Sequence, residues 1–146
     1  MKGEAHEKLE TAALLARRLK TLEPDAVLHV GEVHRVIQQS WFSLVTVRVV
    51  ITGERYRHFI ARHAEMIGAE RQIIEAIHQP DAIHLNERDP NIVVLYRTGA
   101  SGATIRLALW ISDDPGRSNS IHSARFAHAR EKERGTQRGR VITEKS

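Results

Sequence analysis

The stretch "RYRHFIARHAEM", residues 55–66, holds the side chains best suited to chemistry, because two histidines lie in it among three arginines and two aromatic rings. Histidine titrates near neutral pH and can serve as a general acid or base. On a continuous helix of 3.6 residues per turn, His63 shares an apolar face with Phe59 and Met66, whereas His58 and Arg62 lie on the polar side. We therefore expect the two histidines to play different parts. His63 faces the sheet, either as a neutral core residue or with a pKa tuned for catalysis, and His58 with Arg62 is a solvent-exposed pair.

The neighbouring sequence predicts the elements that position these residues. Residues 4–22 are rich in strong helix formers and carry an apolar stripe of Leu9, Ala12, Ala16 and Leu19. A second short helix is predicted over 69–79, and a closing helix over 123–135, with Gly135 past its end. Alternating apolar residues and turn-forming breaks predict strands over 41–52, 82–87, 91–98, 104–112 and 118–124, and a short strand followed by a turn within 26–37.

This order of elements predicts an α+β fold, with N-terminal helices packed on a small antiparallel β-sheet meander. We expect an N-terminal helical extension over 1–40, one α+β domain over 41–134 and a flexible basic tail over 135–146. Thr52 or Gly53 is expected to cap the helix that begins after the first long strand.

Composition narrows the class of protein. The chain of 146 residues is 41% hydrophobic and 27% charged, as expected of one globular domain. It has no cysteine, which excludes disulfides, thiolate metal sites and a cysteine nucleophile. Nine histidines are present without a compact ligand spacing, so we expect no metal site and no cofactor. The N-terminus "MKGEAHEKLE" lacks an apolar signal region and no apolar run could span a bilayer, so we expect a cytoplasmic protein without membrane contact.

The net charge of +4 comes from the C-terminal part of the chain. From residue 115 onward there are eight Lys and Arg against three Asp and Glu. A local basic patch favours phosphate-rich partners such as nucleic acid. The alternative is a solvated charged segment that keeps the protein soluble.

One resemblance ties these features together. The phrases "ITGERYRHFIARHAEM", "IIEAIHQPDAIHL", "VLYRT" and "RLALWI", followed by a polar final strand, resemble the phage-associated branch of the barnase–EndoU–colicin–RelE-like nuclease superfamily. The resemblance covers about residues 41–130. It departs from the family pattern at "HAE", where Ala64 replaces a proline, and at "SIHSARF", where Ser123-Ala124-Arg125 replaces a Thr-Ala-Tyr-like element.

The resemblance implies a barnase/RelE-like fold and a metal-independent endoribonuclease, acting as a toxin of phage or mobile-element origin. In that chemistry the RNA 2′-hydroxyl attacks the adjacent phosphate, which needs a base, a cation for the phosphorane and an acid for the leaving oxygen. The catalytic positions it implies are His63, His122, Ser120, Ser123 and His58. The RNA- and phosphate-binding positions it implies are Arg62, Tyr96, Arg97, Arg106 and Arg125.

Two further hypotheses remain open. The altered "SIHSARF" element favours a catalytically inactive module that binds nucleic acid or protein with the same fold. A homo-oligomer could also form through the N-terminal amphipathic helix. The partners expected for the nuclease are RNA, such as tRNA or another structured RNA, and a neutralising antitoxin or immunity protein.

Overall fold

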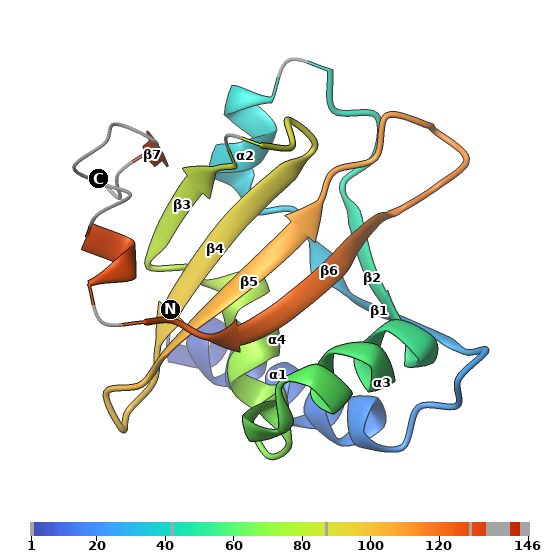
Figure 1. Ribbon diagram of the computed structural model, residues 1–146, viewed down its shortest axis with the longest axis vertical. Helices are drawn as coiled ribbons and strands as arrows, with labels where there is room; N and C mark the ends of the chain where they lie inside the picture. The colour runs from blue at the N-terminus through green and yellow to red at the C-terminus, as the bar shows by residue number, and fades with distance from the viewer. Residues whose placement is uncertain (1, 42, 87, 129, 134–140, 144–146) are drawn as a thin grey trace.

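A computed structural model describes residues 2–41, 43–86, 88–128, 130–133 and 141–143, with side chains from residue 11 to 133 within these ranges. The fold is α+β, with one sheet and with helices packed against one of its faces (Figure 1). No helix within these ranges is long and apolar enough to cross a membrane. The elements, in chain order, are α1 (Lys2–Lys20), β1 (Val27–Glu32), α2 (Arg35–Ser40), β2 (Arg48–Thr52), α3 (Gly53–Arg62), the 3₁₀ turn η1 (Ala64–Met66), α4 (Glu70–His78), β3 (Ala82–Leu85), β4 (Ile92–Thr98), β5 (Thr104–Trp110), β6 (Asn119–Phe126) and β7 (Val141–Thr143).

The sheet is mixed, and its strand order is β1-β2-β6-β5-β4-β3-β7. Strands β3, β4, β5 and β6 pair antiparallel, each with the next. The prediction of a wholly antiparallel sheet is wrong, because β2 runs parallel to β6. After β2 the chain passes through α3, η1 and α4 to β3, which lies far from β2 in the sheet. Strands β4, β5 and β6 then follow one another back toward β2, and β6 reaches it running in the same direction, which requires such a long connection between the two strands.

Asn119 closes the junction between β2 and β6. Its buried side-chain amide donates to the carbonyl oxygens of Thr46 at 2.8 Å and Arg48 at 3.0 Å, and its Oδ1 accepts from the Ser112 N–H at 2.8 Å. Only Asn119 and Ser120 of β6 pair with β2. Beyond them β6 leaves β2, and its later residues lie beside α3.

The main core lies between the sheet and the helices. It joins residues of α1 and β1 to residues of the central strands, so the part of the chain from Ala12 to Ile37 contributes to the same core as the later strands. The expected stripe of α1 is buried at Ala12, Ala16 and Leu19, while the side chain of Leu9 lies outside the described part. The predicted face of α4 is confirmed, since Ile73, Ile74 and Ile77 are all buried. A single core of this extent fits one domain.

Helix α3 starts as expected but ends early. The Thr52 hydroxyl accepts from the Arg55 N–H at 3.1 Å, so Thr52 is the N-cap. Gly53 is required beside it, because a Cβ there would lie 1.8 Å from the Glu23 carbonyl oxygen. The predicted continuous helix through Met66 is wrong, since His63 has φ −133° and ψ 74° and is followed by η1. This break turns Met66 into the core, while the next residue, Ile67, is exposed.

Two other boundaries differ from the sequence-based expectation. The strand predicted over 41–52 comprises only β2, because Trp41 instead ends α2 by donating its N–H to the Ile37 carbonyl at 2.8 Å. The helix predicted over 123–135 is also wrong at its start, where β6 continues to Phe126 in register with β5. Gly135 and most of the expected tail lie outside the described residues, but 141–143 form β7 and pair with β3.

Candidate functional site on the open face of the sheet

The face of the sheet opposite the helices carries three rows of cross-strand neighbours on β4, β5 and β6. Directly paired residues point to the same face. A small apolar cluster of Ile92, Val94, Tyr96 and Ala108 covers part of this face, apart from the main core. The rows are Tyr96–Arg106–Arg125, Val94–Ala108–Ser123 and Ile92–Trp110–Ser120.

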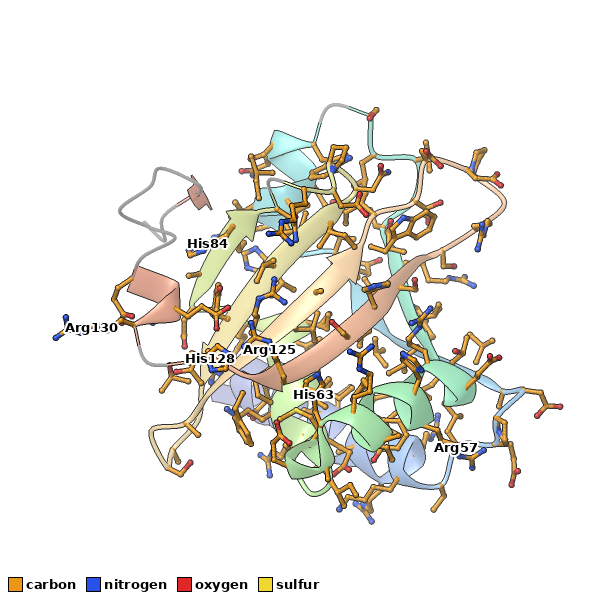
Figure 2. All side chains as sticks on the ribbon, viewed as in Figure 1. Arg57, His63, His84, Arg125, His128 and Arg130 are labelled. Atoms are coloured by element: carbon orange, nitrogen blue, oxygen red, sulfur yellow. The ribbon has the colours of Figure 1, made fainter. Side chains whose placement is uncertain are left out.

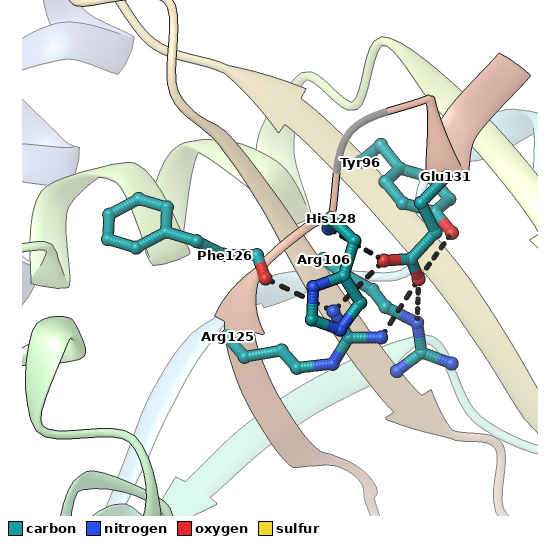
Figure 3. A network of polar contacts seen from close by, with 6 residues as sticks. All are labelled: Tyr96, Arg106, Arg125, Phe126, His128 and Glu131. Carbon is teal, nitrogen blue, oxygen red and sulfur yellow. Dashed lines mark hydrogen bonds and ion pairs between the residues drawn. The ribbon is translucent and has the colours of Figure 1, made fainter.

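The first row binds one carboxylate, that of Glu131 (Figure 3). Arg125 donates from both terminal nitrogens, at 3.0 Å to Oε1 and 2.9 Å to Oε2. The Arg106 Nε lies 3.1 Å from Oε2, and the Tyr96 hydroxyl donates to Oε2 at 3.3 Å. The backbone N–H of His128 completes the set at 3.0 Å from Oε1. Glu131 thus ties the segment after β6 to the open face.

The electrostatics of this group follow from its partial burial. Burial alone would raise the pKa of Glu131, but the hydrogen bonds from Arg125 and the His128 N–H, with the charges of both arginines, hold that pKa below its usual value. Burial, then the charge of Glu131, raises the pKa of Tyr96, partly offset by Arg106. At neutral pH the group is therefore a carboxylate, two guanidinium ions and a neutral phenol, with one net positive charge.

These side chains can perform two of the three tasks of RNA cleavage. Two guanidinium groups on adjacent strands can hold a phosphate and stabilise the charge of a phosphorane. An ionised carboxylate between them can accept a proton from a hydroxyl. His128, on the same turn as Glu131, is exposed, and in Figure 3 its imidazole overlaps the Arg125 guanidinium in the direction of view.

Ser120 and Ser123 lie on this face too, each half-buried in β6, opposite Trp110 and Ala108. Between them His122 is the extra residue of a β-bulge, which shifts the register with β5. Partial burial lowers the pKa of His122, and the charges of Arg55 and His58 lower it further, against the opposing effect of Asp89. Charges on α3 therefore influence the pKa of His122, whereas the pKa shifts of Tyr96 and Glu131 have no contribution from α3.

The structure does not bring the α3 residues into the arginine row. His58 and Arg62 are exposed on the helix, as expected of a solvent-facing pair. His63 was expected to face the sheet, either as a neutral core residue or with a pKa tuned for catalysis, and it is not a core residue. It ends α3, its side chain is 33% exposed and its Nδ1 lies 3.8 Å from a Glu65 oxygen. The early end of the helix is the cause.

Arg97 has a structural contact on the helix side of the sheet. It donates to the Gln79 carbonyl oxygen at 3.0 Å and lies 3.7 Å from an Asp81 carboxylate oxygen. It therefore ties β4 to the end of α4. Since strand residues alternate in direction, its neighbour Tyr96 points to the opposite face.

Sequence reasoning missed Glu131 and His128, the two residues that complete the site. The expected helix over 123–135 hid them, because residues six apart on a helix do not face each other. In the structure, β6 ends at Phe126 and the chain turns back, so Glu131 meets Arg125. The opposite charges of Arg125 and Glu131 could have indicated an ion pair. That pair can be predicted only if the strand is known to end at Phe126, so that the chain can turn back.

A polar cavity of about 400 Å³ lies beside this site, at the tip of the β4–β5 hairpin. Thr98 and Thr104 line one side of it, and His128 and Lys132 line the other. Its lining also includes Arg130, whose backbone has φ 63° and whose side chain points away from the sheet (Figure 2). In the described part of the chain, no three His, Asp or Glu side chains are placed to hold a metal ion together.

Comparison with protein families, with curated proteins and with solved structures finds no match to this chain.

Proposed function

We propose that the chain is a metal-independent endoribonuclease-like domain that binds and cleaves RNA on the open face of its sheet. The observation that carries the proposal is the row Tyr96–Arg106–Arg125 with Glu131 bound across it. It offers a cationic seat for a phosphodiester next to a carboxylate that is ionised at neutral pH.

In this proposal Arg106 and Arg125 hold the scissile phosphate and stabilise the phosphorane. Glu131 accepts the proton of the 2′-hydroxyl as that oxygen attacks phosphorus, and the bond from phosphorus to the 5′-oxygen breaks. The 5′-oxygen takes a proton from an imidazolium, to which we assign His128, and the products are a 2′,3′-cyclic phosphate and a 5′-hydroxyl. Ser120 and Ser123 lie on the same face as this site.

The wider proposals follow from the sequence resemblance. They are a barnase/RelE-like relationship, a toxin of phage or mobile-element origin, a cytoplasmic location and an antitoxin or immunity partner. Helices on one face and the antiparallel strands β3 to β6 with the candidate site on the other support the fold relationship. A homodimer through α1 would need a surface other than its apolar stripe, which already packs in the main core, and Leu14 is exposed there.

One observation favours the second candidate function, a module that binds nucleic acid without cleaving it. Glu131 already engages both guanidinium groups, and the Tyr96 side chain is only 4% exposed. A group so fully satisfied can serve to fix the 127–133 segment instead of performing catalysis. Cleavage assays separate the two candidates.

The test compares the wild-type protein with Arg125→Gln and Glu131→Gln on tRNA and on other structured RNA, in EDTA. Arg71→Gln on α4 is the matched control, because Arg71 is exposed and pairs with Glu75 away from the open face. We expect wild type and control to produce cyclic-phosphate ends, and both site variants to lose at least tenfold in rate while remaining folded in thermal melts. Binding without cleavage by wild type would favour the module, and neither binding nor cleavage would overturn both candidates.

A further inference from the structure

Trp110 is the aromatic side chain that continues the open face beyond the arginine row. It is the last residue of β5, and its cross-strand partners are Ile92 on β4 and Ser120 on β6. Its half-buried indole packs against the small apolar cluster of this face. The Arg117 guanidinium carbon lies 5.4 Å from the centre of the ring, a cation–π distance. The indole is thus supported by the cluster and has a cation over its ring.

The path from Trp110 to the arginine row is straight. Arg106 and Trp110 are four residues apart on one strand, and their pairing with β4 continues without a register shift, so both point to the open face. At about 3.4 Å per residue their separation along the strand is roughly 14 Å. That length matches about four stacked nucleotides of one strand, and fewer when the strand is extended.

We infer that Trp110 is a nucleobase-stacking site for single-stranded RNA whose scissile phosphate lies on Arg106 and Arg125. This inference rests on the proposed function and adds a second point of contact for the same substrate. An aromatic ring accepts any base by stacking, and Arg117, displaced from the ring by that base, can contact a neighbouring phosphate. Recognition of an unpaired base a few nucleotides from the cleaved bond directs the enzyme to loops and single-stranded ends.

The chain is well suited to a direct test, because it contains only two tryptophans, Trp41 and Trp110. Trp41 packs against the main core on the helix side, so Trp41→Phe leaves Trp110 as the single reporter. The probe is a single-stranded 2′-O-methyl octanucleotide, which lacks the attacking hydroxyl. We expect saturable quenching of Trp110 fluorescence by the octanucleotide and none by an abasic strand of equal length.

Affinity measurements complete the test. We expect Trp110→Ala to weaken octanucleotide binding about 5- to 150-fold. Trp110→Phe retains a stacking ring and should recover most of that loss, which a purely structural role of the indole would not require. The loss should also be greater for the octanucleotide than for a dinucleotide, which is too short to reach from the arginine row to Trp110. Thermal melts identify any variant that fails to fold, and in that case the quenching and Trp110→Phe measurements decide.

The outcomes separate this inference from the proposed function. Wild-type cleavage without quenching of Trp110, or with equal binding by the folded Trp110→Ala variant, overturns the stacking site and leaves the nuclease proposal standing. Quenching and stacking-dependent binding without any cleavage support the stacking site on a module that only binds RNA. Absence of both binding and cleavage overturns the inference together with the proposed function.

Discussion

Arg106 and Arg125 are direct cross-strand partners, and their guanidinium groups share the carboxylate of Glu131. Like charges placed opposite each other destabilise a sheet unless a counter-charge joins them. Glu131 supplies that charge from the segment after β6, so the same contacts neutralise the row and anchor the segment. The Glu131 side chain therefore contributes both to the stability of the fold and to the geometry of the candidate site.

Replacement of Glu131 by Gln should destabilise the protein by about 1–3 kcal/mol, the usual cost of lost hydrogen bonds to charged groups. The arginine side chains are only 20% and 24% exposed, so water compensates for little of the loss. Urea unfolding monitored by circular dichroism measures the change. Glu133→Gln is the matched control, because Glu133 is exposed two residues further on. Equal midpoints for the two variants would contradict the anchoring role.

The contribution of Glu131 to stability should also depend on pH. Its pKa in the folded protein lies below the ordinary value of about 4.3, so its contribution is complete above that value and is lost as the pH falls through the folded-state pKa. We expect the difference in melting temperature between wild type and Glu131→Gln to be constant near neutral pH and to shrink toward pH 3. If this difference in melting temperature instead grew as the pH fell, the pKa of Glu131 would be raised in the folded protein and not lowered.

His122 should titrate below the ordinary histidine value of about 6.5. Partial burial is the main cause, and the charges of Arg55 and His58 add to it. Arg55→Gln removes a positive charge and should raise the pKa of His122, as seen by following its ring protons by NMR as a function of pH. Arg62→Gln on the exposed side of the same helix is the control. An unperturbed His122 in the wild-type protein would show that α3 does not influence this position.

Substitution of the buried residue Glu70 should also lower the stability of the protein. The Glu70 carboxylate accepts from the Tyr56 hydroxyl at 2.5 Å and from the Gly68 N–H at 3.0 Å and 3.1 Å, and the Glu70 side chain is 1% exposed. Burial and the contact with Glu70 raise the pKa of Tyr56, so the phenol stays a donor at all moderate pH values.

We expect Glu70→Ala to cost about 1–3 kcal/mol, because it leaves two donors without an acceptor at the start of α4. Tyr56→Phe removes one hydrogen bond and should cost less, about 0.5–1.5 kcal/mol. Chemical denaturation gives both values, with the more exposed Glu65→Ala as control. A smaller loss for Glu70→Ala than for Tyr56→Phe would exclude the carboxylate as the centre of this contact.

The sequence predicted a strand or helix correctly where its apolar residues followed a single clear period. The alternation from Ile105 to Ile111 predicted β5, and the isoleucines of α4 predicted its buried face. The open-face positions of Tyr96, Arg106 and Arg125 follow from the same alternation, once the strands are paired. Alternation in the sequence assigned only Arg106 and Trp110 to this face; Tyr96 and Arg125 were named through the resemblance, and Arg125 lay in a predicted helix that is a strand in the structure.

Predictions failed where distant contacts decide the structure. Helical periodicity continues through His63, but the Tyr56–Glu70 contact and the burial of Met66 accompany an earlier end of α3. The segment around Arg125 is rich in helix formers, yet cross-strand pairing with Arg106 keeps it extended. Neither the parallel pairing of β2 with β6 nor the meeting of Glu131 with the arginine row has a local signature.

The pairing of β7 with β3 has a consequence for how the protein can be handled. Ile83 and His84 pair with residues 143 and 141, so the chain supplies its own neighbour to a strand whose last residue, Leu85, is exposed. Removal of that neighbour would leave the hydrogen-bonding groups of β3 free to recruit a strand from another molecule. Shortened forms that stop before residue 141 should therefore be more prone to self-association, and a purification tag is better placed at the N-terminus.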